Sequence, residues 1–251
     1  MIVYVNGDSH GVGAELVTQT RNGIVLEFND DTKNYQPACC DTNNIDLECI
    51  KRSYSQLLAD RLNAKLVCEA ESGGSNARIL RVTRNYLKNN CPNLVVIGWS
   101  PFEREEWQHN GIYYQITGGG VSSVPAELAN KYKQWVIDNS DPVAINSKTI
   151  SMHREIFNLH QELLELNIPH IFFNTFNSFQ FIPDMGGTPV EWDNYYIEPY
   201  LESHTYCMWL KNQNYQTVSP TSMHFGPKGH QAWANLLFQH YNKNDTIYKR
   251  R

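Results

Sequence analysis

The sequence predicts an α/β fold with three layers, in which helices cover both faces of a parallel β-sheet. Short apolar runs typical of buried strands alternate along the chain with segments whose apolar residues recur at helical spacing. The chain has 251 residues, of which 41% are hydrophobic and 19% charged, so it is long enough to bury a substantial core. We expect residues 1–251 to form a single domain.

Four strands are expected at the apolar runs 2–5, 65–68, 94–97 and 170–173. Helical spacing of apolar residues predicts helices over 54–62, 76–90 and 151–167, and a last helix that begins near Pro227, a residue suited to a first helical turn. Strands separated by helices imply right-handed crossovers, and therefore parallel pairing.

Two long segments, 101–141 and 174–219, interrupt this alternation. Both leave the carboxyl ends of predicted strands, and loops of this length in a compact α/β domain are usually functional or contain small elements of their own. Their aromatic side chains can stack on sugar rings in a cleft, or they can form a satellite core beneath the loops. These aromatic residues are Trp107, Tyr113, Tyr114, Trp135, Trp192, Tyr195 and Tyr196.

The first expected strand runs directly into Asn6-Gly7-Asp8-Ser9-His10. A tight turn there places the Ser9 hydroxyl at the carboxyl edge of the sheet, where open α/β proteins bind their ligands, and Asp8 can hydrogen-bond across the turn. By itself Gly-Asp-Ser is a common loop sequence. A candidate base, His224, lies in the loop before the last predicted helix.

A serine after the first strand and a histidine before the last helix resemble the layout of the SGNH (GDSL-type) hydrolase family. Ala70-Glu71-Ser72-Gly73-Gly74-Ser75 resembles the glycine block of that family, and Val95-Val96-Ile97-Gly98-Trp99-Ser100 stands where the family has a Gly-x-Asn turn. The resemblance covers four short blocks in the family's order. It implies a flavodoxin-like sheet and a serine hydrolase that needs no cofactor or metal.

The resemblance also implies roles for individual residues. Ser9 is expected to be the nucleophile and His224 the base. The oxyanion hole would consist of the backbone N–H groups of Ser9 and Gly73, with Ser100 as a third donor in place of the family's asparagine. Asn76 is a second candidate for the missing amide, or alternatively a helix N-cap.

Thr221 stands where the family has the aspartate that orients the histidine. Its hydroxyl can accept a hydrogen bond but carries no charge, so Thr221 and Asp8 are predicted only as supporting residues. Losing this carboxylate can reduce turnover by about ten-thousandfold in a serine hydrolase.

Other polar residues near these motifs have less specific interpretations. His230 competes with His224 as the base, but its position inside a helix favours a structural or surface role. His10 is expected to line the cleft. Arg104, Glu105 and Glu106 form a charged run that is either solvated or able to contact a substrate.

Together these features predict a serine esterase that removes a small acyl group, most plausibly acetate, from a carbohydrate. The small acyl group is expected because no apolar lid is long enough to cover a fatty chain. One alternative is a carbohydrate-binding or structural module with this fold and impaired catalysis. Another is a metal phosphoesterase that uses Asp8, His10 and His224, although the usual metal-ligand spacings are absent.

Composition excludes several other classes of protein. A net charge of −5 argues against a general nucleic-acid binder, and no apolar stretch approaches the ~18–20 residues of a membrane span. The six cysteines show no paired zinc-site spacing. The first residues look like a core strand rather than a leader, which predicts a cytoplasmic protein. The large insertions would suit a phage-encoded member of the family, for which a virion location is possible.

Overall fold

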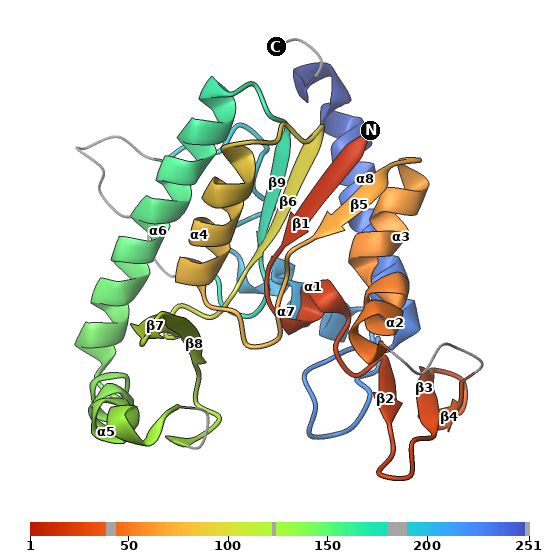
Figure 1. Cartoon of the computed structure of the whole chain (residues 1–251). Coiled ribbons are helices and arrows are strands. Elements are labelled where there is room, and N and C mark those ends of the chain that lie inside the picture. Colours follow the sequence, from red (N-terminus) through yellow and green to blue (C-terminus); the bar gives the residue numbers. More distant parts are fainter. Residues whose placement is uncertain (39–43, 122–123, 180–189, 249–251) are drawn as a thin grey trace.

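The computed structural model describes residues 1–38, 44–121, 124–179 and 190–248 (Figure 1). Its central sheet has four parallel strands in the order β5 (Lys65–Cys68), β1 (Ile2–Asn6), β6 (Leu94–Trp99) and β9 (His170–Asn174). In chain order this is 2-1-3-4, which confirms the flavodoxin-like arrangement. At the outer edge of β9, Phe172 pairs with 195–197 through a single parallel bridge.

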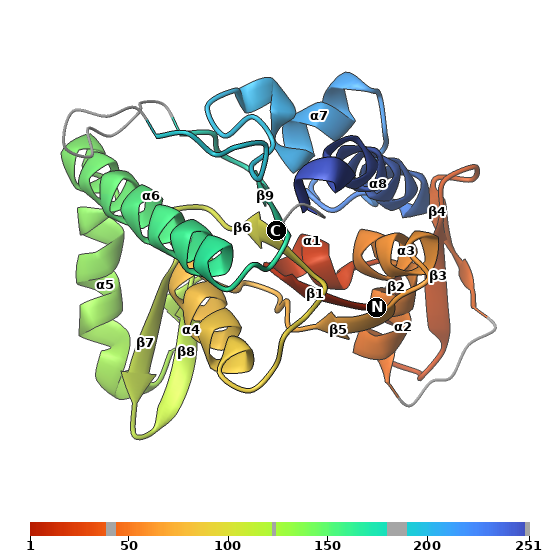
Figure 2. The same ribbon diagram turned by 90° about the horizontal axis from the view of Figure 1, so that it is seen from above.

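Helices cover both faces of this sheet, as predicted (Figure 2). α3 (Tyr54–Arg61) and α8 (Pro227–Tyr248) pack on one face, and α4 (Asn76–Leu87) and α6 (Pro142–Glu165) on the other. Alternate side chains of β1 enter different cores: Val3 and Val5 join the α3/α8 cluster, whereas Tyr4 joins the α4/α6 cluster. No helix within the described ranges is long and apolar enough to cross a membrane.

Several helix boundaries differ from the sequence prediction. α2 (Ile45–Arg52) precedes α3, and the extended backbone of Ser53 separates the two helices. α6 begins at Pro142 rather than near 151, because Asp141 caps it by accepting a hydrogen bond from Val143 N at 3.0 Å. α8 begins at Pro227, as expected.

Two small antiparallel sheets lie beyond the carboxyl end of the main sheet (Figure 1). One consists of β2 (Val17–Gln19), β3 (Val25–Asn29) and β4 (Asn34–Pro37), and the sequence analysis did not predict it. The other is a hairpin of β7 (Glu105–His109) and β8 (Ile112–Ile116) inside the first long insertion. Its Asn110-Gly111 turn has positive φ angles of 49° and 79°, the residue pair and conformation that favour a two-residue hairpin loop.

The remainder of both insertions is partly helical. The first continues with a 3₁₀ helix, η2 (Ala126–Leu128), and with α5 (Ala129–Asp138). The second includes η3 (Glu202–His204) and α7 (Tyr206–Asn212). Residues 122–123 and 180–189 of these insertions are outside the described ranges.

Most insertion aromatics are core residues, so the sugar-stacking interpretation is wrong for them. Trp107 and Trp135 pack in a separate cluster with Ile116, and Trp192 packs against the α6 side of the main core. Tyr195 and Tyr196 are also buried, whereas Tyr114 is half-buried and Tyr113 is 44% exposed. The satellite-core interpretation therefore describes these loops better.

Candidate active site

Ser9 stands at the point where β1 ends and the short helix α1 (Ser9–Val12) begins. The turn needs a glycine at position 7, because a Cβ there would lie 3.0 Å from the Gly98 carbonyl oxygen of the neighbouring strand. Asp8 caps α1 by accepting a hydrogen bond from His10 N at 3.1 Å. Ser9 is therefore at the carboxyl edge of the sheet, where β1 lies between β5 and β6.

His224 lies in the loop before α8, and its imidazole reaches Ser9. Its Nε2 atom is 2.8 Å from Ser9 Oγ, although the residues are 215 positions apart. The loop is held by a bridge between Thr217 and Phe225 and by Val218 N, which donates to the His224 carbonyl oxygen at 2.9 Å. The side chain of Phe225 is fully buried, which anchors the segment in the core.

The carboxylate that faces His224 comes from Glu15, a residue that the sequence analysis did not single out. Glu15 Oε2 is 2.9 Å from His224 Nδ1 and accepts a hydrogen bond from Ser222 Oγ at 2.5 Å. Thr221 is exposed, and its hydroxyl pairs with Ser219 Oγ at 3.3 Å rather than with the histidine. The prediction of Thr221 as the residue that supports His224 is therefore wrong.

The backbone of Glu15 has an unusual conformation that aims this side chain. Its φ is 67°, in the left-handed region that non-glycine residues rarely adopt and that costs about 1–3 kcal/mol. Tyr35 Oη donates to the Glu15 carbonyl oxygen at 2.8 Å, so the small sheet β2–β4 holds the turn. The position of β4 therefore helps to place a carboxylate beside His224.

The hydrogen bonds define how His224 can act. With Glu15 as acceptor, Nδ1 carries the proton and Nε2 is free to accept the Ser9 hydroxyl proton. Burial lowers the pKa of His224 below its ordinary value, and so does the nearby positive charge of His10, while Glu15 opposes both. Burial would raise the pKa of Glu15, but hydrogen bonds from Ser222 and His224 lower it. The pair is thus a neutral imidazole beside a carboxylate.

His10 is buried, with 1% of its surface exposed, so the expectation that it lines the cleft is wrong. Its Nδ1 atom is 2.9 Å from Asp8 Oδ1, and its Nε2 atom is 3.3 Å from the Met223 carbonyl oxygen. Burial alone would lower the pKa of His10, but the Asp8 carboxylate raises it to about 10. A charged His10 ring therefore lies 5.1 Å, centroid to centroid, from the ring of His224.

Two of the residues that line the cleft have backbone N–H groups that are not used elsewhere in the described structure. Ser9 and Gly73 both line it, and neither N–H group has a hydrogen-bond partner within the described part of the chain. Gly73 has a φ of 76°, and the turn that contains it is closed by Gly74 N, which donates to the Glu71 carbonyl oxygen at 2.9 Å. Only glycine adopts this conformation readily, which explains the glycine at this position.

The two side chains considered as further oxyanion donors do not line the cleft. Asn76 is fully buried, and its amide exchanges two hydrogen bonds of 2.8 Å with the backbone of Ser100. The N-cap of α4 is Ser75, not Asn76, so both interpretations of Asn76 are corrected. Ser100 is 2% exposed, and its hydroxyl accepts a hydrogen bond from Arg104 Nη1 at 2.8 Å.

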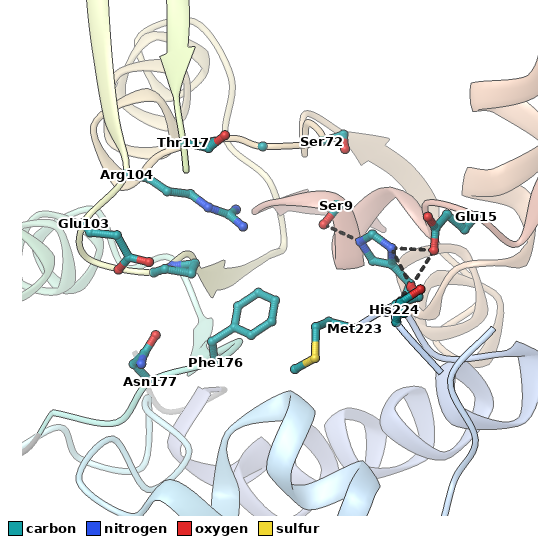
Figure 3. Close-up of a pocket in the computed structure, with 14 residues that line it drawn as sticks. Ser9, Glu15, Ser72, Glu103, Arg104, Thr117, Phe176, Asn177, Met223 and His224 are labelled. Atoms are coloured by element: carbon teal, nitrogen blue, oxygen red, sulfur yellow. Dashed lines mark hydrogen bonds and ion pairs between the residues drawn. The ribbon is translucent and has the colours of Figure 1, made fainter. Parts of the chain in front are cut away.

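The cleft is an open cavity of about 670 Å³, and most of the residues that line it have polar side chains, although about half of its exposed surface is apolar (Figure 3). The Arg104 side chain extends into it in the direction of Ser9. Glu105 and Glu106 instead pair with Lys148 and Arg81, so only the first residue of the predicted charged run faces the cleft. The lining residues are Ser9, Glu15, Ser72, Gly73, Pro101, Glu103, Arg104, Thr117, Phe176, Asn177, Thr221, Ser222, Met223 and His224.

His230 is 1% exposed, and its Nδ1 atom accepts a hydrogen bond from Tyr54 N at 3.1 Å, as expected for a structural histidine. Over the described ranges, no group of three or more His, Cys, Asp or Glu side chains is placed to hold a metal ion. Ser9 and Glu15 occupy both ring nitrogens of His224, so the geometry does not favour the metal site considered from the sequence.

Comparison with solved structures finds matches to proteins described as esterases. A carbohydrate esterase whose active site is described as having catalytic and non-catalytic binding functions is 15% identical, with a TM-score of 0.47 over 98% of this chain. An acetyl xylan esterase from the rumen bacterium Butyrivibrio proteoclasticus is 12% identical, with a TM-score of 0.43 over 98% of this chain. The chain spans 66% and 64% of the lengths of these two proteins.

A protein from Desulfitobacterium hafniense, described as lipolytic and of the G-D-S-L family, is 10% identical, with a TM-score of 0.35 over 95% of this chain and 98% of that protein. No protein-family model and no curated protein matches the chain.

Proposed function

We propose that this chain is an SGNH-type serine esterase that hydrolyses small acyl esters. The observation that carries the proposal is the hydrogen-bonded series Ser9–His224–Glu15, with distances of 2.8 and 2.9 Å, at the wall of an open cavity. A nucleophile, a base and a carboxylate that orients the base are the parts that acyl transfer requires. The sequence motifs that resemble the family supply the same serine and histidine.

The reaction would proceed through an acyl-enzyme. Ser9 Oγ forms a bond to the ester carbonyl carbon while its proton passes to His224 Nε2, and the carbonyl π electrons move to the oxygen. When the tetrahedral intermediate collapses, the bond to the alcohol breaks and His224 returns the proton to the leaving oxygen. A water molecule then attacks the acyl-serine in the same way, with His224 taking its proton, and the acid is released as His224 returns the proton to Ser9 Oγ. Glu15 stabilises the imidazolium in both halves.

Negative charge on the carbonyl oxygen would be met by the N–H groups of Ser9 and Gly73. Both residues line the cavity, and their N–H groups have no protein acceptor among the described residues, so both donors are available to an oxyanion. A well-aimed donor of this kind contributes about 2.7–4 kcal/mol to catalysis. Ser100 and Asn76 take no direct part in this hole.

The side chains that line the cavity support a substrate with a small acyl group on a polar alcohol, most plausibly a carbohydrate. Among the described residues that line it, three have apolar side chains (Pro101, Phe176 and Met223), which are too few to enclose a long acyl chain. The hydroxyl, amide and charged groups of Thr117, Asn177 and Glu103 are available for hydrogen bonds with the hydroxyls of a sugar. The support is therefore the polar side chains among the lining residues, not the aromatic insertions.

The test is hydrolysis of p-nitrophenyl acetate and of acetylated glucose by wild type, Ser9→Ala and His224→Ala. Wild type should be active on both, and each variant should lose about 10³-fold or more in kcat. p-Nitrophenyl palmitate should be a poor substrate, because the cavity does not shelter a fatty chain. Equal rates in all three proteins would overturn the esterase and favour the binding module, and loss of activity on adding a chelator would favour the metal enzyme.

A further inference from the structure

Arg104 is a cationic side chain in the cleft that has no part in the proposed Ser9–His224–Glu15 mechanism. Arg104 lines the cavity, yet its side chain is only 17% exposed. Arg104 belongs to the loop that follows β6. The resembled family has an asparagine at the first position of this loop, and its side chain supplies an oxyanion donor. Here that position is Ser100, whose hydroxyl is buried and accepts from Arg104. A guanidinium therefore reaches the cleft where an amide would be expected.

Fixed contacts hold this guanidinium in place. Arg104 Nη1 donates to Ser100 Oγ at 2.8 Å and to Asp8 Oδ2 at 3.3 Å, and the group lies over the ring of Phe176, with Cζ 5.8 Å from the ring centroid. Both polar contacts use the same nitrogen. Nη2 and Nε have no protein acceptor among the described residues, so the guanidinium retains donors for a ligand in the cleft.

The contacts of Asp8 also help to hold the Arg104 guanidinium beside Ser9. Asp8 directly precedes the nucleophile, is fully buried, and contacts two cations, His10 at 2.9 Å and Arg104 at 3.3 Å. Thr175 Oγ1 donates a further hydrogen bond to it at 3.2 Å. Asp8 is thus held between two cations, and of these only Arg104 lines the cleft. Of the acidic residues that line the cleft, Glu15 pairs with His224, and Glu103 is exposed on the other side of Arg104.

We propose that Arg104 is a catalytic residue that donates to the oxyanion, in place of the amide that the resembled family has at position 100. The proposal rests on the proposed esterase function. As the bond between Ser9 Oγ and the carbonyl carbon forms, the carbonyl π electrons move to the oxygen. Arg104, together with the N–H groups of Ser9 and Gly73, stabilises the negative charge that results. Ser100 and Asp8 are positioning residues that hold the guanidinium.

The experiment compares wild type with Arg104→Gln, Arg104→Lys and Ser100→Ala, using the neutral ester p-nitrophenyl acetate. Glutamine at position 104 has no charge, and its side chain is two atoms shorter than that of arginine, so its amide would not reach the oxyanion. Arg104→Gln should therefore lower kcat by about 10²–10³-fold with KM changed by less than about threefold, because the oxyanion exists only in the transition state. Arg104→Lys should retain more activity than Arg104→Gln. Ser100→Ala should lose less than about tenfold, because the donor itself remains.

Two further measurements separate catalysis from folding. Arg84 is also paired with carboxylates but lies between α4 and α6, so Arg84→Gln should keep the wild-type kcat. Guanidine added at millimolar concentration to Arg104→Ala should restore part of the lost kcat, which a purely structural role of Arg104 would not allow.

Specific results would overturn the proposal. An unchanged kcat in Arg104→Gln would do so, as would a larger loss in Ser100→Ala than in Arg104→Gln. If Arg104→Gln raised KM only for esters that carry a carboxylate, Arg104 would be an anion-binding residue for the substrate. If wild type failed to hydrolyse the ester, both the esterase function and the role of Arg104 would be rejected.

Discussion

Glu15 Oε2 lies 2.9 Å from His224 Nδ1, across 209 residues of sequence. The carboxylate comes from the turn after α1, six positions beyond the serine in the chain, and not from the loop that carries the histidine. The left-handed backbone of Glu15 and the hydrogen bond from Ser222 aim it at the imidazole. The carboxylate beside His224 therefore comes from a different element than position 221, where the resembled family has its aspartate, and the chain order is Ser9, Glu15, His224.

Replacing Glu15 with glutamine should lower kcat for p-nitrophenyl acetate by up to about ten-thousandfold, because an amide does not stabilise the imidazolium and can favour the wrong tautomer. Steady-state kinetics checks this. Glu27→Gln is a matched control, since Glu27 is also an exposed, ion-paired carboxylate but faces Arg52. Wild-type kcat in Glu15→Gln would show that the contact between Glu15 and His224 is not functional.

The activity of the wild type should rise with pH along a limb that lies below pH 6.5. Only neutral His224 can accept the Ser9 proton, and burial together with the charge of His10 lowers its pKa in the folded protein. Protonation at low pH therefore removes the base. The measurement is kcat/KM against pH for a neutral ester, and a limb centred above pH 6.5 would contradict the expectation.

His10→Gln should move this limb to higher pH. The substitution removes a positive charge 5.1 Å from the His224 ring, while Glu15 and Asp8, which still pairs with Arg104, continue to favour the imidazolium. The pKa of His224 should therefore rise. The same pH series on this variant checks the direction, with a thermal melt to confirm folding, and a shift toward lower pH would refute the role of the His10 charge.

The free energy of unfolding should increase between pH 5 and pH 6.5, partly because of His230. Burial lowers its pKa in the folded protein to about 3, so it stays neutral, whereas the unfolded chain binds a proton near pH 6.5. Stability from this group is therefore lost as the pH falls below 6.5. Urea unfolding at several pH values should show a slope smaller by up to about 1.4 kcal/mol per pH unit in His230→Gln. An equal slope would exclude this linkage.

Trp192→Ala should destabilise the fold by about 3–5 kcal/mol, as expected for a large buried side chain. Tyr113, which is 44% exposed and lies under Arg81, is the comparison, and Tyr113→Ala should cost less than about 1 kcal/mol. Denaturant unfolding measures both. A stable Trp192→Ala variant that had lost only sugar affinity would instead restore the sugar-stacking interpretation.

The sequence predicted the parts of the molecule that local pattern controls. Short continuous apolar runs predicted all four strands of the central sheet. Parallel pairing followed from the helices predicted between them. The β2–β4 sheet was missed because its short strands are polar on one side and lack a strong apolar run. α6 was predicted too short because its first turns pack little apolar surface.

The sequence by itself therefore determined the layers of the fold, and it singled out Ser9 and His224, which lie near opposite ends of the chain. Tertiary structure alone decided which carboxylate faces His224, which cation enters the cleft, and that Asn76 and Ser100 do not line it. The physical reason is distance. Strand and helix periodicity is read over a few neighbouring residues, whereas Glu15 and Arg104 acquire their partners only when separate loops meet at the edge of the sheet.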